Sequence, residues 1–281
     1  MNEQQLKHYL SHLIGNNEEI EKEHIETVLK AMLNYIGTPD SELRDKLIYR
    51  TFYFSITKGI FSTRQLKETL DTVLGSDYLF HGLGSTENDT VFTRSFSSLV
   101  IAIILQYNVT HSFLSTSEIR KILESLILYT YKECDVRGFV PGKGWAHSIA
   151  HIADAIDEMG KQTQLSNENL LSLLKVVLTK ASYQATVYQS DESERLLTAV
   201  LTILQNLDSD TVYHLIHSFQ IRIIKEYKTL PSNLGFNQTI NWKQFLTALY
   251  FRLKKLDHNP VILDSVEGYI YELAKPYFPS T

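Results

Sequence analysis

Three side chains that can bind a metal ion recur at helical spacing near the middle of the chain. His147, His151 and Asp154 lie at positions i, i+4 and i+7, which a helix places on one face. Two imidazoles and a carboxylate form a partial site for zinc or a harder divalent ion. Such a metal would activate water for hydrolysis, with Asp135 or Glu194 as the base. The alternative is that the histidines only pack, or hydrogen-bond to a neighbouring helix.

The segment GFVPGKGW, just before these residues, has two interpretations. Lys143 and its flanking glycines precede a helix expected to begin near Trp145, which suits a pocket for an anion. The spacing differs from that of a phosphate-binding loop, and no Ser or Thr follows Lys143. The other interpretation is a simple chain reversal at Pro141 and the glycines. Asp135 and Arg137 lie at the mouth of this loop and could pair with each other.

Helical periodicity runs through the whole chain, and strand-like alternation is absent. Capping boxes predict helix starts at Ser62, Ser115 and Asp191, and Asn259 followed by Pro260 predicts another. We expect helices over about 3–14, 17–36, 41–58, 63–75, 90–107, 116–133, 144–159, 167–187, 191–206, 209–227, 240–256 and 260–276.

Five of these helices share a polar start and a rich apolar face, and they recur at about 50 residues, as in HEAT and armadillo repeats. Roughly equivalent early positions in these inner helices hold Asp45, Arg94, His147, Arg195 and Lys243. The expected fold class is therefore all-α. We expect an α/α solenoid of about five to six stacked helical hairpins. Its curvature could approach a partial toroid, and it would form one domain over residues 1–281.

Long loops are expected before three inner helices, at residues 76–89, 135–143 and 228–239. In a stacked array these loops share one edge with the inner-helix N-termini, whose free N–H groups favour an anion. The candidate ligand-binding residues near this edge are Arg94, Asp135, Arg137, Lys143, Trp145, His147, His151, Asp154, Glu194, Arg195 and Asn241. A ladder of ion pairs between repeats is the alternative explanation of such a polar row.

The composition of the chain limits the classes of partner and the compartment that we expect. The formal net charge of −5 disfavours a nucleic acid or an anionic membrane. The longest apolar run, Leu99 to Leu105, is too short to cross a bilayer, and the N-terminus has no signal-peptide pattern. The single cysteine, Cys134, excludes an internal disulfide and fits a reducing compartment. We expect a cytoplasmic protein whose partner is a peptide, a protein or a small anionic ligand.

The segments DTVFTRSFSSL, DVRGFVPGKGWAHSIAHIAD and SDESERLLTAV resemble a family of bacterial proteins described as domain of unknown function 2785. The resemblance spans roughly residues 75–250, and the middle segment is its most specific part. It implies a helical fold and an uncharacterised role, and it supplies no activity, substrate or catalytic residue. The residues that fit the family pattern are Asp89, Arg94, Arg137, Gly138, Gly144, Trp145, His147, His151, Asp154, Glu192 and Arg195.

Two functions remain open from the sequence. The first is a binding or interaction module whose polar site lies at the N-termini of the inner helices. The second is a metal-assisted hydrolase that uses His147, His151 and Asp154. The chain has no Gly-x-Ser-x-Gly motif and no Gly-rich nucleotide motif, and this favours the binding module.

Overall fold

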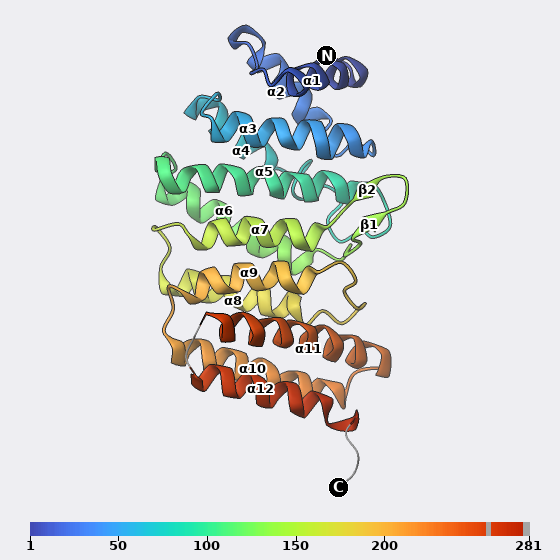
Figure 1. Ribbon diagram of the computed structural model, residues 1–281, viewed down its shortest axis with the longest axis vertical. Helices are drawn as coiled ribbons and strands as arrows, with labels where there is room; N and C mark the ends of the chain where they lie inside the picture. The colour runs from blue at the N-terminus through green and yellow to red at the C-terminus, as the bar shows by residue number, and fades with distance from the viewer. Residues whose placement is uncertain (257–259, 278–281) are drawn as a thin grey trace. The chain divides into compact units, whose positions relative to one another are not determined.

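The computed structural model describes residues 1–256 and 260–277, which are helical apart from loops and one two-stranded hairpin (Figure 1). The all-α prediction is confirmed. Contacts between elements divide the chain into two compact units, Met1–Gln164 and Leu165–Thr281. One domain over the whole chain stays a prediction.

Unit 1 consists of helices with short 3₁₀ and π segments and one β-hairpin. In chain order they are α1 (Glu3–Asn16), η1 (Lys22–His24), α2 (Ile25–Asn34), η2 (Glu42–Ile48), α3 (Tyr49–Thr57), α4 (Thr63–Val73), α5 (Thr90–His111), α6 (Thr116–Lys132), β1 (Phe139–Val140), β2 (Gly144–Trp145) and α7 (Ser148–Gly160). Figure 1 shows α3, α5 and α7 side by side, and α5 packs against both neighbours and against α4.

Helix α5 forms the core of unit 1. It is buried around most of its circumference, which its apolar composition permits at little desolvation cost. Within the described residues it is the one helix long and apolar enough to cross a membrane, yet 78% of its most apolar window is buried inside the protein. Packing within the unit therefore accounts for its hydropathy.

Unit 2 has five α-helices and a final 3₁₀ turn among its described residues. They are α8 (Asn167–Ala181), α9 (Glu192–Leu204), α10 (Ser209–Tyr227), α11 (Ser232–Lys255), α12 (Pro260–Ala274) and η3 (Lys275–Tyr277). Helix α9 packs against α8 and α11, and α11 also packs against α10 and α12. Helices α9 and α11 are therefore direct neighbours within one unit.

Local capping signals placed several helix starts correctly. The Ser62 and Ser115 side chains accept from the third helical N–H of α4 and α6, and each box is closed by the Gln or Glu at that position. The Asp191 box is wrong, because Asp191 has a left-handed backbone at φ 59° and its side chain makes no capping hydrogen bond. Pro260 does begin α12, whereas Asn259 lies outside the described residues.

Several element boundaries differ from the sequence prediction. In place of the helix expected over 17–36, the chain forms the short η1 and then α2, which ends at Asn34. Helix α7 begins at Ser148 rather than near 144, because Gly142 and Gly144 have positive φ and turn the chain into the β-hairpin. Helix α8 ends at Ala181, so residues 182–191 form a loop that was not expected.

The predicted long loop at 228–239 is also wrong, because α11 already begins at Ser232. Gly235 lies inside this helix at a close approach, where an added Cβ would come 3.3 Å from the Tyr227 Cα. The glycine therefore serves helix packing here, although in sequence it is typical of a loop.

Candidate functional site

Arg94, in the second turn of α5, is fully buried and makes hydrogen bonds through all three nitrogens. Its Nε and Nη2 donate to the two Glu133 carboxylate oxygens at 2.7 and 3.0 Å. Its Nη1 donates to the His81 carbonyl at 2.9 Å and to the Thr90 hydroxyl at 2.7 Å. Burial alone would lower the pKa of Arg94, but the Glu133 carboxylate outweighs burial and raises it. Arg94 thus holds the loop before α5 onto the end of α6.

Asp135 and Arg137 pair with each other, as one reading of the sequence anticipated. The Arg137 Nε and Nη2 donate to the two Asp135 oxygens at 2.8 and 2.7 Å. Nη2 also donates to the Asn88 carbonyl at 2.7 Å, and the Glu87 N–H donates to Asp135. The hydrogen bond to Asp135 raises the pKa of Arg137. Asp135 is 2% exposed and therefore fixes a loop rather than serving as an accessible base.

Lys143 is also held by the protein itself. Its Nζ donates to both Asp89 carboxylate oxygens at 2.7 and 2.8 Å. Its backbone carbonyl accepts from Nη2 of the buried Arg44 at 2.6 Å, and the Arg44 guanidinium lies 4.1 Å from the centre of the Phe92 ring. Burial lowers the pKa of Arg44. Sequence inspection did not identify Arg44, although it fastens the hairpin to η2.

Of the predicted metal set, only His151 and Asp154 lie within α7. His147 precedes α7 as its N-cap residue, with a left-handed backbone at φ 46°. The Ser95 hydroxyl donates to the Ala146 carbonyl, so the His151 Nδ1–H donates to the Ser95 oxygen at 2.6 Å. Across residues 1–256 and 260–277, no group of three or more His, Cys, Asp and Glu side chains could hold a metal ion, this predicted set included.

The hairpin carries aromatic side chains toward solvent. Phe139 and Trp145 pair across β1 and β2 with ring centroids 5.3 Å apart, and they are 58% and 43% exposed. The Trp145 ring also lies 4.3 Å from the His147 ring. These contacts make Trp145 part of a ring cluster that stiffens the hairpin.

In unit 2, Asn241 of α11 is fully buried and holds the loop at 182–191. Its Oδ1 accepts from the Tyr188 N–H at 2.8 Å. Its Nδ2 donates to the Tyr183 and Thr186 carbonyls at 2.7 and 2.8 Å. The sequence placed Asn241 at an edge and missed this loop, so its role was not predictable.

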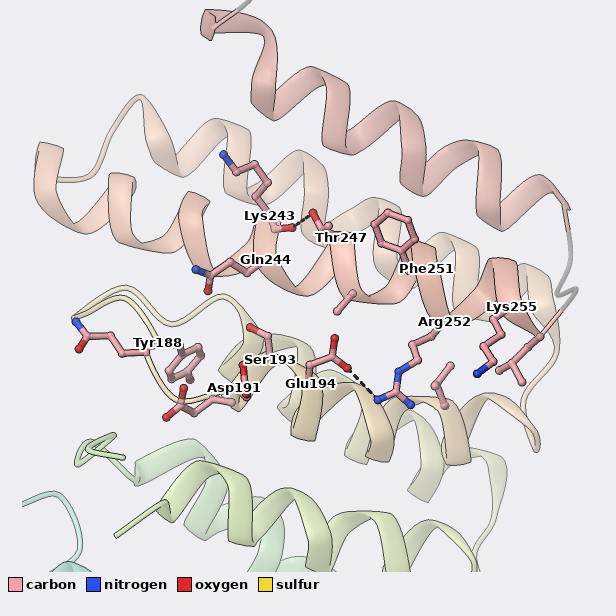
Figure 2. A pocket seen from close by; sticks show the side chains of 15 residues that line it. Tyr188, Asp191, Ser193, Glu194, Lys243, Gln244, Thr247, Phe251, Arg252 and Lys255 are labelled. Carbon is pink, nitrogen blue, oxygen red and sulfur yellow. Dashed lines mark hydrogen bonds and ion pairs between the residues drawn. The ribbon is translucent and has the colours of Figure 1, made fainter. Parts of the chain in front are cut away.

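Beside this loop, α9 and α11 enclose an open groove of about 910 Å³ (Figure 2). Glu194 of α9 and Arg252 of α11 form an ion pair across it at 2.9 Å. Of the predicted residues in unit 2, Glu194 lines the groove, whereas Arg195 and Asn241 are not among its lining residues. The most exposed apolar side chain in the lining is Phe251, at 64%.

A buried acid, Glu192, lies at the start of α9, at one end of the groove. Glu192 is 1% exposed and accepts from the Ser190 N–H at 2.8 Å. Burial raises the pKa of Glu192, and backbone N–H groups at Ser190, Glu192 and Gln189 oppose that rise. An anion is therefore not favoured at this helix N-terminus, contrary to the general expectation for the edge.

Comparison with known proteins shows which family the chain belongs to. The family model described as "Protein of unknown function (DUF2785)" matches residues 79–251, more than half of the chain. The chain belongs to this family. The DUF2785 match includes the Arg94–Glu133 pair and most of the α9–α11 groove, but not Arg44. No curated protein and no solved structure matches the chain.

Proposed function

We propose that this DUF2785 protein is a cytoplasmic helical-repeat binding module that holds an extended peptide segment of a partner protein in the α9–α11 groove. The main observation in support of this proposal is the groove itself, which combines exposed apolar surface with side chains of both charges. Surfaces of this kind, with an apolar centre and a polar rim, are typical of protein recognition.

The groove offers the contacts that an extended peptide needs. Phe251, Ala248 and Leu201 supply apolar surface. The Gln244 amide can donate to and accept from a peptide backbone, whereas the Thr247 hydroxyl donates to the Lys243 carbonyl and can only accept. Glu194 and Arg252 pair with each other, so the middle of the groove presents no uncompensated positive charge that would favour a simple anion. A peptide meets these requirements better than a small anionic ligand does.

The packing order within each unit supports the repeat interpretation. In unit 1, α3, α5 and α7 pack successively, and in unit 2, α9 packs against α11. A helical hairpin leaves an apolar face that only its neighbours can bury. We therefore retain the α/α solenoid, with the groove as the space between two successive inner helices.

The proposal is tested by panning a phage library of random heptapeptides on the purified protein and on a Thr247→Trp variant that fills the groove. Thr57→Trp is the matched control, because the Thr247 and Thr57 hydroxyls both donate to the carbonyl four residues earlier, at 2.8 and 2.7 Å. Thr57 lies in α3 and does not line the groove.

We expect peptides that bind the wild type and Thr57→Trp equally, and that bind Thr247→Trp at least about tenfold more weakly, a loss of about 1.4 kcal/mol. Thermal unfolding of both variants checks that they remain folded. Peptides that bind Thr247→Trp undiminished, or no enrichment on the wild type, would refute the proposal.

A further inference from the structure

The ionic side chains of the groove are separated by sign along its length. Asp191 and Glu192 lie at the start of α9, whereas Arg252 and Lys255 lie in the last turns of α11. Figure 2 shows Asp191 and Lys255 at opposite ends of the groove, with Glu194 and Arg252 paired between them. One end is therefore acidic and the other basic.

The terminal charges are available to a ligand. Within the described part of the chain, neither Asp191 nor Lys255 has an ion-pair partner. The remaining cation of the lining, Lys243, places its Nζ 5.4 Å from the centre of the Tyr277 ring, and Figure 2 shows it pointing away from α9. Lys243 therefore does not cancel the acidic end.

An independent observation marks the acidic end as a place for a ligand. Ser193 is only 8% exposed, and its hydroxyl has no hydrogen-bond partner among the described residues. Figure 2 shows this side chain directed from the start of α9 toward α11. A buried hydroxyl without a partner is costly, and a ligand group in the groove would relieve that cost.

The distance between the two ends sets the length of the ligand. Gln244 faces the start of α9 in Figure 2, and from there to Lys255 the helix rises about 16 Å at about 1.5 Å per residue. An extended chain advances about 3.3–3.6 Å per residue, so it covers this distance in about five residues.

We infer that the groove recognises an extended segment in one orientation, with a basic side chain beside Asp191 and Ser193 and an acidic side chain about five residues away beside Lys255. This inference rests on the proposed function. A purely structural explanation of the same charges exists, because acids at a helix N-terminus and cations at a C-terminus stabilise the helices themselves. The experiment must therefore measure ligand choice as well as stability.

The test pans the same heptapeptide library on Asp191→Asn and on Lys255→Gln. Asparagine tolerates the left-handed backbone of Asp191, so this variant removes charge without added strain. The matched controls are Asp210→Asn, in the first turn of α10, and Lys254→Gln, whose Nζ lies over the Tyr250 ring. Neither control residue lines the groove.

On the wild type and both controls, we expect enriched peptides to carry a Lys or Arg and an Asp or Glu about five positions apart. Asp191→Asn should abolish enrichment of the basic residue alone, and Lys255→Gln that of the acidic residue alone. A synthetic peptide with its two charges exchanged should bind the wild type about fivefold more weakly, as expected for half-exposed ion pairs.

The outcomes separate the two proposals. If peptides fail to bind Thr247→Trp but carry no basic and acidic residues at a fixed separation, the inference about charge and orientation is refuted, while peptide binding in the groove still holds. A charge pattern unchanged in Asp191→Asn and Lys255→Gln would also refute it. If no peptide depends on Thr247, both proposals fail.

Discussion

The polar cluster of unit 1 and the groove of unit 2 have similar side chains in opposite states. Arg94 and Asp135 are enclosed in hydrogen bonds to neighbouring loops, whereas Asp191 and Lys255 face an open groove. Charge and burial alone would have favoured the first region as the site. The two regions therefore differ in whether their charged side chains already have partners within the described part of the chain, and this difference is what separates the proposed groove from the cluster of unit 1.

The two regions also fasten a loop by different chemistry. Unit 1 uses the buried ion pair of Arg94 with Glu133, both 0% exposed at the side chain. Unit 2 uses the neutral amide of Asn241. Leaving a buried charge without its partner costs far more free energy than losing a buried amide hydrogen bond. Removal of Arg94 should therefore lower the free energy of unfolding much more than removal of Asn241.

The largest effect should follow Arg94→Met. Removal of the guanidinium leaves the buried Glu133 carboxylate without its countercharge, which costs about 3–5 kcal/mol of unfolding free energy. Urea denaturation measures the loss. The double variant Arg94→Met with Glu133→Gln should recover part of it, because no buried charge remains. A loss below about 1 kcal/mol in the single variant would show that the pair does not fasten unit 1.

Asn241→Ala should have a smaller and more local effect. It leaves the Tyr188 N–H and two carbonyls without their partner, which costs about 1–3 kcal/mol. Hydrogen exchange at the Tyr188 amide should accelerate, while the amides of α5 keep their protection. Uniform acceleration in both units would contradict a local role for Asn241.

Glu118 in unit 1 and Glu192 in unit 2 should contribute to folding stability with opposite dependence on pH. Burial raises the pKa of Glu118, but hydrogen bonds from the Ser115 hydroxyl and N–H and from Lys67 outweigh it and lower the pKa to about 2. Its contribution to stability is therefore complete above its ordinary value of 4.5 and is lost as the pH falls toward about 2. For Glu192, burial raises the pKa above its ordinary value of 4.5. Ionisation of Glu192 therefore destabilises the folded protein as the pH rises above 4.5.

Urea denaturation between about pH 3 and about pH 6 checks this contrast. The stability deficit of Glu118→Gln should narrow as the pH falls. Glu192→Gln should gain stability relative to the wild type as the pH rises. The same trend in both variants would contradict the assignment.

Lys143→Met should have the smallest effect. The Lys143 and Asp89 side chains are 41% and 42% exposed, and ion pairs this exposed contribute about 0.2–1 kcal/mol. The loss should disappear at high salt, where exposed charges are screened. The Arg94→Met loss should persist at the same salt concentration because that pair is fully buried.

Local signals made much of the helical fold predictable. A capping box such as that of Ser115 acts within four residues, so the sequence alone places the start of α6. The hairpin and the start of α11 were not predictable, because glycine at 142 and 235 serves a turn in one case and close packing in the other.

The candidate site was only partly predictable. The sequence identified Glu194 but not its neighbour Ser193. A serine is a common surface residue, and only the folded structure shows that this hydroxyl is buried without a hydrogen-bond partner among the described residues. The roles of Arg94 and Asn241 depend on residues 39 and 53 positions away. No local pattern reports such distant contacts.

The hydrogen bond from Arg44 to the Lys143 carbonyl joins positions 99 residues apart. Family membership is defined by residues 79–251, yet a chain shortened to that stretch would lose Arg44 and uncover the Phe92 ring beneath it. It would also lose Ser41, whose Cβ packs so tightly that any side chain at Gly144 would lie 2.6 Å from it. We therefore expect a chain shortened to residues 79–251 to be less stable than the full chain, with the hairpin as the first part to unfold.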